Sequence, residues 1–219
     1  MKYTHYVFDA YGTLFDVHAA ASRHADDIGE GWDRLSQTWR AKHLEYTWIY
    51  AQTGRHTTFW DLTERSLDTA IATIGGVPSG IREKLLEAYR VLDAYPEVPG
   101  VLDALRAKGA TCAILTNGDP DMIADATSSA GIADKLDRIL TVHDVGIFKP
   151  SMRVYSLVTD TFGCKPGAVS FQSSNRWDAA GATVFGFDTL WVNRSGAPAE
   201  YSETPPTRVA TDLKPLRDD

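Results

Sequence analysis

The segment Phe8-Asp9-Ala10-Tyr11-Gly12-Thr13-Leu14 places a carboxylate between a short apolar run and a turn. A carboxylate exposed on such a turn can act as a nucleophile, because its oxygen needs no deprotonation at neutral pH. Taken alone, an Asp followed three residues later by Gly is more typical of a residue that caps a turn or a helix. Asp9 is therefore a candidate nucleophile only in combination with other segments.

Four further segments could carry chemistry, and each also has a purely structural interpretation. An Arg on an amphipathic helix is usually solvated, Asn-Gly is a common turn, a Lys before Pro is normally exposed, and Ser or Asn often caps a helix. A helix cap and an anion site use the same N–H groups, so these two interpretations can hold together. The segments are Trp39-Arg40-Ala41-Lys42-His43-Leu44-Glu45-Tyr46-Thr47, Leu115-Thr116-Asn117-Gly118, Phe148-Lys149-Pro150-Ser151 with Tyr155, and residues 171–182, FQSSNRWDAAGA.

The elements that position these segments follow from hydrophobic spacing. Apolar runs at residues 6–8, 112–115, 138–141, 168–171 and 189–192 predict buried strands, and segments with helical spacing lie between most of them. This alternation predicts a parallel sheet with helices on both faces. Ligands of such sheets bind beyond the carboxyl ends of the strands, where we expect Asp9, Thr116, Asn117 and the Ser173-Ser174-Asn175 loop to meet.

Residues 16–95 break the alternation, because their apolar stripes predict helices only. We therefore expect a helical cap domain at 16–95, inserted into a core domain made of residues 1–15 and 96–219. Pro96 and the Pro99-Gly100 pair mark the return to the core, since both interrupt a continuing helix. Residues 208–210 predict a short edge strand near the end of the chain.

Composition restricts the possible partners. With 219 residues, 43% hydrophobic and 23% charged, the chain can form one good-sized core and a smaller appended domain. The 22 Lys and Arg against 29 Asp and Glu give a net charge of -7 without a basic run, so we expect no nucleic-acid partner. A small anionic substrate remains possible, because a few local cations suffice to capture it.

The two cysteines and the apolar runs indicate the cellular compartment of the protein. Cys112 and Cys164 are too few for a disulfide scaffold, and we expect both to be buried free thiols. The N-terminus has no long apolar run with a cleavage site, and no stretch reaches membrane-spanning length. We therefore expect a cytoplasmic location and no membrane partner.

In their order and spacing, the five segments resemble the haloacid dehalogenase (HAD) superfamily, and within it the L-2-haloacid dehalogenases. The most specific matches are Trp39-Arg40-x-Lys42-x-Leu44-Glu45-Tyr46 and Ser173-Ser174-Asn175-x-x-Asp178. The fold class implied is α/β, a Rossmann-like parallel sheet core with an inserted helical cap.

One position separates two chemistries of this superfamily. Its magnesium-dependent phosphatases carry a second Asp two residues after the nucleophile, which protonates the leaving alcohol, and this chain has Tyr11 there. Carbon–halogen displacement expels an anion that needs no proton, so the missing acid harms phosphoester hydrolysis but not dehalogenation. Two serines and an amide at residues 173–175 also make a poor magnesium site, so we expect no metal and no cofactor.

The resemblance implies a metal-independent (S)-2-haloacid dehalogenase that converts small L-2-haloalkanoic acids to D-2-hydroxy acids and halide. Asp9 would attack C2, and Asp178 would then activate the water that hydrolyses the aspartyl ester. The catalytic residues implied are Asp9, Thr13, Arg40, Asn117, Lys149, Tyr155, Ser173, Asn175 and Asp178, with Arg40 and Asn117 at the halide. The substrate-binding residues implied are Ala10, Tyr11, Leu44, Phe59, Thr116, Asn117 and Trp177, and a homodimer is implied as well.

Two alternatives stay open at this point. A magnesium phosphatase of the same superfamily is favoured by Asp9 and Lys149 and opposed by Tyr11 and the Ser-Ser-Asn loop. A non-catalytic binding protein with the same fold is opposed by the intact set of site residues. The spacing around Tyr155 fits a core residue and a site residue equally well, and the resemblance favours the site.

Overall fold

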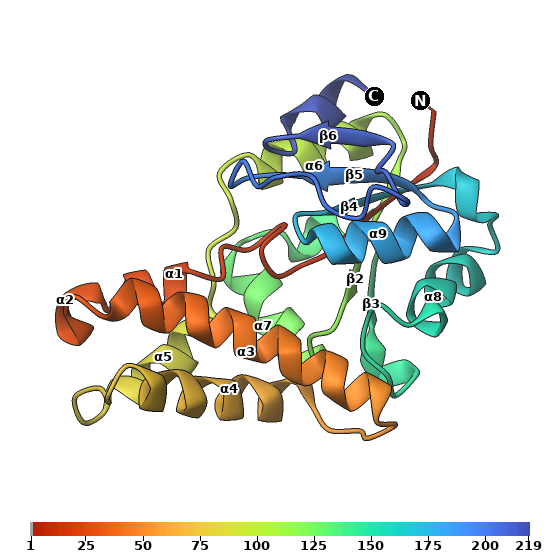
Figure 1. The fold of residues 1–219 in the computed structure, drawn as a ribbon. Helices are drawn as coiled ribbons and strands as arrows, with labels where there is room; N and C mark the ends of the chain where they lie inside the picture. The colour runs from red at the N-terminus through yellow and green to blue at the C-terminus, as the bar shows by residue number, and fades with distance from the viewer. Residues whose placement is uncertain (1) are drawn as a thin grey trace.

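Within residues 2–219, which the computed structural model describes, six parallel strands form one sheet in the order β3-β2-β1-β4-β5-β6 (Figure 1). The strands are β1 (His5–Phe8), β2 (Thr111–Thr116), β3 (Arg138–Thr141), β4 (Val169–Ser173), β5 (Asp188–Val192) and β6 (Arg208–Ala210). Tyr6, Val7 and Phe8 of the central strand are fully buried, as expected of a parallel strand covered on both faces. The α/β fold class predicted from the sequence is confirmed.

Helices cover both faces of the sheet. The chain runs outward from β1 to β3 through α6 (Val98–Ala107) and α7 (Pro120–Ser129), and returns through α8 (Met152–Phe162) and α9 (Arg176–Phe185). Because such crossovers are right-handed, the two pairs lie on opposite faces, and Figure 1 shows α9 in front of the sheet and α6 behind it. The direction changes at β1, and ligands bind at such a switch point.

Between β1 and α6 the regular elements are all helices. It forms α1 (Ala19–Ser22), α2 (Ala25–Ile28), α3 (Trp32–Gln52), α4 (Phe59–Thr73) and α5 (Ile81–Arg90), a layer at the lower left of Figure 1. Buried Leu35, Trp39 and His43 recur every four residues along α3, which places them on the face that packs against the neighbouring helices. The division into a cap at 16–95 and a core at 1–15 and 96–219 remains a prediction.

Three details differ from the sequence-based expectations. Pro99 and Gly100 do not interrupt a helix but lie in the first turn of α6, where Pro is tolerated because the first N–H groups have no partner within the helix. Ser173 ends β4 instead of beginning the following loop. Cys112 is buried as expected, but Cys164 is only half-buried, and both thiols are free.

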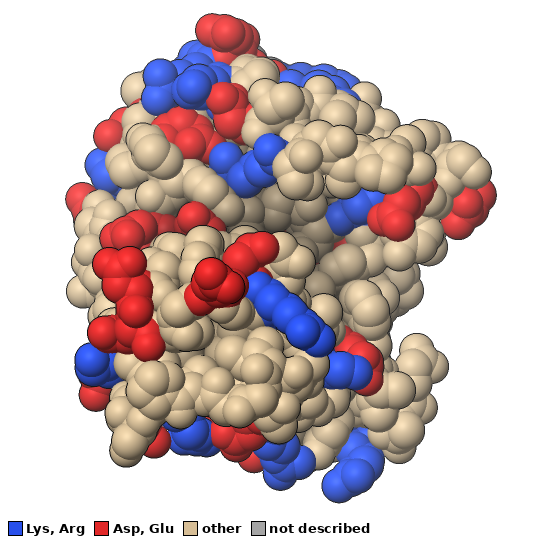
Figure 2. All heavy atoms as spheres, turned by 60° about the vertical axis from the view of Figure 1, so that its left-hand side comes forward, with Lys and Arg blue, Asp and Glu red and all other residues tan. Residues whose placement is uncertain are grey.

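The surface carries charges of both signs. On the face drawn in Figure 2, Lys and Arg are interspersed with Asp and Glu, and a hollow separates the upper part from the lower part. No helix between residues 2 and 219 is long and apolar enough to cross a membrane.

Candidate active site

Asp9 follows β1 at the switch point of the sheet, and its two carboxylate oxygens are held unequally. Oδ2 accepts hydrogen bonds from Thr13 Oγ1 (3.2 Å), Ser173 Oγ (3.2 Å) and Asn175 Nδ2 (2.7 Å). Oδ1 accepts one from Lys149 Nζ (3.2 Å). The carboxylate is therefore oriented through Oδ2, which leaves Oδ1 as the oxygen with free lone pairs.

The turn after Asp9 has to approach the end of β4 closely. Gly12 adopts φ +89°, and a Cβ atom on it would lie 3.1 Å from Ser174 Oγ, so a side chain here would be both strained and crowded. The same approach lets the Ser174 N–H donate to Thr13 Oγ1 at 2.8 Å. This contact locks together two loops that are far apart in the sequence.

Lys149 connects the two carboxylates of the site. Its ammonium group is almost fully buried and donates to Asp9 Oδ1, to Asp178 Oδ2 (2.8 Å) and to the carbonyl oxygen of Leu115 (2.7 Å). Burial lowers the pKa of Lys149, but the charges of Asp178 and Asp9 outweigh burial, and the pKa is raised overall. Lys149 therefore carries a fixed positive charge between the two acids.

Asp178 lies in the first turn of α9 and is fully buried. The pKa of Asp178 is raised to about 6, mainly by burial and also by the charge of Asp9, while the charge of Lys149 opposes the rise. The Tyr155 hydroxyl donates to Asp178 Oδ1 at 2.7 Å, while the Tyr155 ring packs edge-on against Phe171. Tyr155 thus belongs to the core and contacts the site, so the two interpretations of its spacing hold together.

Arg40 reaches the site from α3. Its Nη2 donates to the carbonyl oxygen of Tyr11 (3.1 Å) and to Asn175 Oδ1 (3.0 Å). Because the other end of the Asn175 amide donates to Asp9, that side chain joins the arginine to the candidate nucleophile. A guanidinium has five donors, so Arg40 can also bind an anion in the cavity.

The loop after β2 supplies further polar groups. Thr116 Oγ1 accepts from the N–H of Gly118 (3.0 Å), and Asn117 Oδ1 accepts from the N–H of Lys149 (2.9 Å). The second contact orients the amide so that Asn117 Nδ2 is the end available to an anion.

These groups surround a small enclosed cavity of about 10 Å³. Most of the residues predicted from the sequence meet there, and Thr13, Ser173, Tyr155 and Asp178 form the layer of hydrogen-bond partners behind them. Ala10 does not line the cavity, and its carbonyl oxygen instead accepts N–H groups of the turn. The lining residues are Asp9, Tyr11, Arg40, Leu44, Phe59, Thr116, Asn117, Lys149, Asn175 and Trp177.

An aromatic cluster supports one wall of the cavity, and no site role was predicted from the sequence for two of its members, His43 and Tyr89. Tyr11 stacks on Tyr89 (ring centroids 5.5 Å apart, planes at 14°) and contacts Phe59, whose ring lies 4.1 Å from that of His43. Burial raises the pKa of Tyr11 well above its ordinary value and lowers that of His43 to about 3. Tyr89 lies in no motif, and His43 occupies an unassigned position of the Trp39–Thr47 segment, so only their positions on the apolar faces of two helices indicate that they are buried.

Asp119 also supports the site, although no role there was predicted for it from the sequence. It precedes α7, yet its carboxylate accepts from the N–H groups of Phe59 (3.1 Å) and Trp60 (2.8 Å) at the beginning of α4. Anionic groups are favoured at helix N-termini, so Asp119 ties α4 to the sheet and positions the Phe59 ring. Its sequence context, Asp-Pro, indicates a helix start, but the helix it binds is not its own.

Residues 2–219 contain no cluster of three or more His, Cys, Asp and Glu side chains that could hold a metal ion. Near Asp9, the end of β4 and the following loop contribute Ser173 and Asn175 in place of carboxylates, and the ammonium of Lys149 already pairs with both acids of the site. This donor set suits an organic anion better than a divalent cation.

Comparison with known proteins shows similarity along almost the whole chain. The family model of the haloacid dehalogenase-like hydrolases matches residues 3–186. The chain is 42% identical over 211 residues to (S)-2-haloacid dehalogenase 1 of Pseudomonas sp. strain CBS-3, covering 96% of this chain and 93% of that protein. It is 39% identical to (S)-2-haloacid dehalogenase 4A of Burkholderia cepacia, covering 96% and 91%.

Solved structures of dehalogenases are also similar to this chain along almost its whole length. A dehalogenase crystal structure with an intermediate complex superposes with a TM-score of 0.96 at 38% identity, covering 98% of this chain and 96% of that one. The L-2-haloacid dehalogenase of Xanthobacter autotrophicus with covalently bound chloropropionic acid gives a TM-score of 0.89 at 33% identity, covering 99% and 97%.

Proposed function

The chain belongs to the haloacid dehalogenase-like hydrolase family, and from this premise we propose that it hydrolyses the carbon–halogen bond of small L-2-haloalkanoic acids to give D-2-hydroxy acids and halide. The observation that carries the proposal is the unequal binding of the Asp9 carboxylate. Three neutral donors hold Oδ2, whereas Oδ1 keeps free lone pairs beside Lys149. A carboxylate held in this way presents one oxygen for attack in a fixed direction.

In the first step, Asp9 Oδ1 attacks C2 of the substrate from the side opposite the halogen. The new C2–O bond forms as the carbon–halogen bond breaks, and the halide leaves with the bonding electron pair. Arg40 and the Nδ2 group of Asn117 stabilise the charge that develops on the halide. Configuration at C2 inverts, so an L-substrate yields a D-product.

In the second step, water attacks Cγ of the Asp9 ester. Asp178 takes one proton from this water, with Tyr155 orienting its carboxylate and Lys149 lying beside it. Oδ2 becomes the ester carbonyl oxygen, and its donors Thr13, Ser173 and Asn175 then stabilise the negative charge that forms on it. Cleavage of the acyl–oxygen bond releases the 2-hydroxy acid, whose hydroxyl takes up the proton that Asp178 received, and the second proton of the water leaves the Asp9 carboxyl to solvent, which restores the carboxylate.

We assign substrate binding to the remaining lining residues. Thr116 and its backbone bind the substrate carboxylate, and Tyr11, Leu44, Phe59 and Trp177 enclose the alkyl group. The charges of Lys149 and Arg40 compensate the substrate anion and the nucleophile, so no metal ion is required. A homodimer and a cytoplasmic location, which the resemblance implies, remain predictions.

Halide release from L-2-chloropropionate in excess EDTA tests the function. We expect steady release by the wild type and none by Asp9→Asn. Magnesium-dependent hydrolysis of an aryl phosphate without halide release would contradict the proposal. A single turnover in ¹⁸O-water tests the intermediate, because label should enter the Asp9 carboxylate and not the product hydroxyl.

A further inference from the structure

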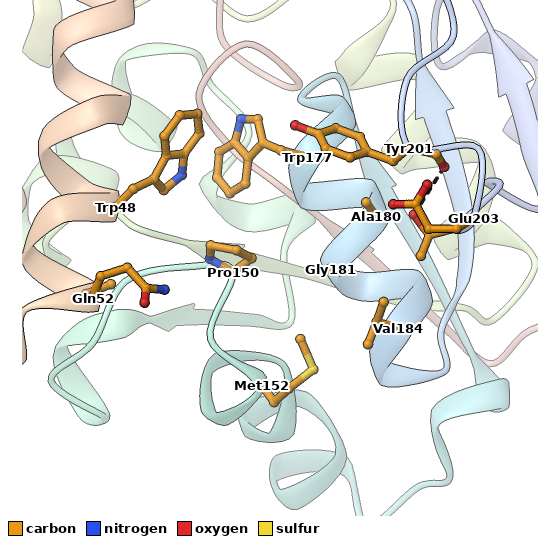
Figure 3. A pocket seen from close by; sticks show the side chains of 12 residues that line it. Trp48, Gln52, Pro150, Met152, Trp177, Ala180, Gly181, Val184, Tyr201 and Glu203 are labelled. Carbon is orange, nitrogen blue, oxygen red and sulfur yellow. Dashed lines mark hydrogen bonds between the residues drawn. The ribbon is translucent and has the colours of Figure 1, made fainter.

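A large open groove lies next to the active-site cavity, between α3, α9 and the loop at residues 200–204 (Figure 3). Its volume is about 520 Å³, compared with about 10 Å³ for the cavity around Asp9. Figure 3 shows the side chains of Trp48 and Trp177 pointing toward one another from α3 and α9, with Pro150 beneath them. The two indole rings meet edge to face, with centroids 5.5 Å apart.

The groove is apolar. Its lining includes the apolar side chains of Trp48, Pro150, Met152, Trp177 and Val184. Among the described residues that line it, Glu203 is the only charged one. Such a groove favours an uncharged hydrocarbon group and disfavours a carboxylate. An acid bound here must therefore place its carboxylate elsewhere.

Trp177 joins the groove to the active site. Its side chain lines both the groove and the cavity that contains Asp9, and Pro150 of the groove directly follows Lys149 of the cavity. The buried indole N–H of Trp177 has no hydrogen-bond partner among residues 2–219. The Trp177 ring lies between the cavity and the groove and is held by packing. A ligand can therefore displace it without breaking a hydrogen bond of its indole N–H.

The wall of the groove formed by the loop at residues 200–204 is held in place by hydrogen bonds from Arg176. Arg176, next to Trp177, donates to the carbonyl oxygens of Tyr201 (3.0 Å) and Thr204 (2.7 Å). These bonds hold the loop at residues 200–204 against α9, so the groove does not have to form when a ligand arrives.

We propose that this groove binds the alkyl chain of 2-haloalkanoic acids longer than three carbons, with Trp177 as the partition that limits chain length and Trp48 as the outer contact. The inference rests on the proposed function, because C2 of the substrate must lie at Asp9 for the chain to point toward Trp177. The carboxylate stays in the polar cavity, and the longer alkyl chain leaves the cavity past the Trp177 ring, which also lines the groove. The groove then supplies apolar surface for each further methylene.

Kinetics with two substrates of the same halogen test the assignment. The measured quantity is the ratio of kcat/KM for 2-bromohexanoate to kcat/KM for 2-bromopropionate. Trp177→Ala removes the partition and should raise this ratio about tenfold or more, whereas Trp48→Ala removes apolar contact and should lower it about three- to tenfold. Ile49→Ala is the matched control, because Ile49 is exposed on the same helix and does not line the groove.

If Trp48→Ala leaves the ratio of the two kcat/KM values unchanged, the groove does not bind the alkyl chain, even if Trp177→Ala changes that ratio. Light scattering on the same variants identifies a competing occupant. If Trp48→Ala changes the molar mass in solution and leaves the ratio unchanged, a second copy of the chain covers the groove and the proposal is wrong.

Calorimetric binding of unreactive acids separates this inference from the proposed function. Dissociation constants for propanoate, butanoate and hexanoate should fall along the series by up to about fourfold per methylene, and less steeply in Trp48→Ala. This trend can hold in a protein that releases no halide, in which case the dehalogenase proposal fails and the groove stands. Equal dissociation constants for propanoate and hexanoate contradict the groove.

Discussion

The hydroxyl of Tyr155 donates a 2.7 Å hydrogen bond to the carboxylate of Asp178, and both side chains are buried. The contact orients the acid that we assign to water activation, and it also stabilises the charged form of that acid. Burial raises the pKa of Asp178 to about 6, and the hydrogen bond from Tyr155 opposes the rise. Tyr155 therefore acts together with burial, Lys149 and Asp9 in setting the pKa of Asp178, and with it the pH range in which Asp178 can accept a proton from water.

The first prediction concerns this pH dependence. Asp178 accepts a proton only when it is ionised, so kcat should fall about tenfold per pH unit below pH 6. Tyr155→Phe removes a donor to the carboxylate, which raises the pKa of Asp178 and moves the acidic limb to higher pH. Profiles of kcat between pH 5 and pH 8 measure the shift, with Tyr46→Phe as a control because its hydroxyl bonds to Thr69 within the helical layer. An acidic limb that stays in place in Tyr155→Phe would refute the assignment.

A second prediction uses the close approach of α9 to Tyr155. A Cβ atom on Gly181 would lie 2.5 Å from the Tyr155 hydroxyl and 2.9 Å from Pro150 Cβ. Gly181→Ala should therefore displace Tyr155, lower kcat about tenfold and cost about 1–3 kcal/mol of unfolding free energy. Gly167→Ala, where a Cβ meets nothing within 4 Å, is the matched control. Urea unfolding measures the loss of stability, and steady-state kinetics measure kcat. If Gly181→Ala and Gly167→Ala have the same kcat and the same unfolding free energy, the close approach of Gly181 to Tyr155 has no effect and the prediction is wrong.

The third prediction concerns Asp119 as the link between the sheet and α4. Asp119→Ala leaves the N–H groups of Phe59 and Trp60 without their acceptor, which should cost about 1–2 kcal/mol. Because Phe59 lines the cavity, KM should rise more than kcat falls. Asp121→Ala is the control, since its carboxylate is exposed and pairs only with surface Arg90 in the described part of the chain. A loss of stability with KM unchanged would limit Asp119 to a structural role.

The fourth prediction is an acid sensitivity caused by His43. Burial first, and then the charge of Arg40, lowers the pKa of His43 to about 3. Below the ordinary His pKa of about 6.5, the unfolded chain binds a proton that the folded protein excludes, so stability falls with decreasing pH until about pH 3. His43→Gln removes this effect. Relative to the variant, the wild type should lose about 1.4 kcal/mol per pH unit below pH 6.5, or about 2 kcal/mol by pH 5.

Urea unfolding at pH 7, 6 and 5 measures this difference. Gln is chosen because it can keep a hydrogen bond to Thr63, the partner of His43 Nε2 at 3.2 Å. If the free energies of unfolding of the two proteins change equally with pH, the pKa of His43 does not differ between the folded and unfolded states, and the prediction is wrong.

Local sequence patterns were sufficient to predict the strands, the helical stretch after β1 and the residue types of the site. Apolar runs and helical spacing are local patterns, and they predict buried strands and helices because burial follows side-chain periodicity. The replacement of a second acid by Tyr11 is likewise visible in one motif. For the same reason, the sequence was less accurate where a local signal has two meanings, as with Pro99, which lies in the first turn of α6 although it was expected to interrupt a helix.

Tertiary contacts determine which oxygen of Asp9 is free, because its donors Lys149 and Ser173 lie 140 and 164 residues from it along the chain. The tertiary structure also brings Asp119 to the N-terminus of α4 and makes Trp177 line both a small cavity and a large groove. These relationships depend on distances between segments, which close packing of the whole core sets and no local pattern encodes.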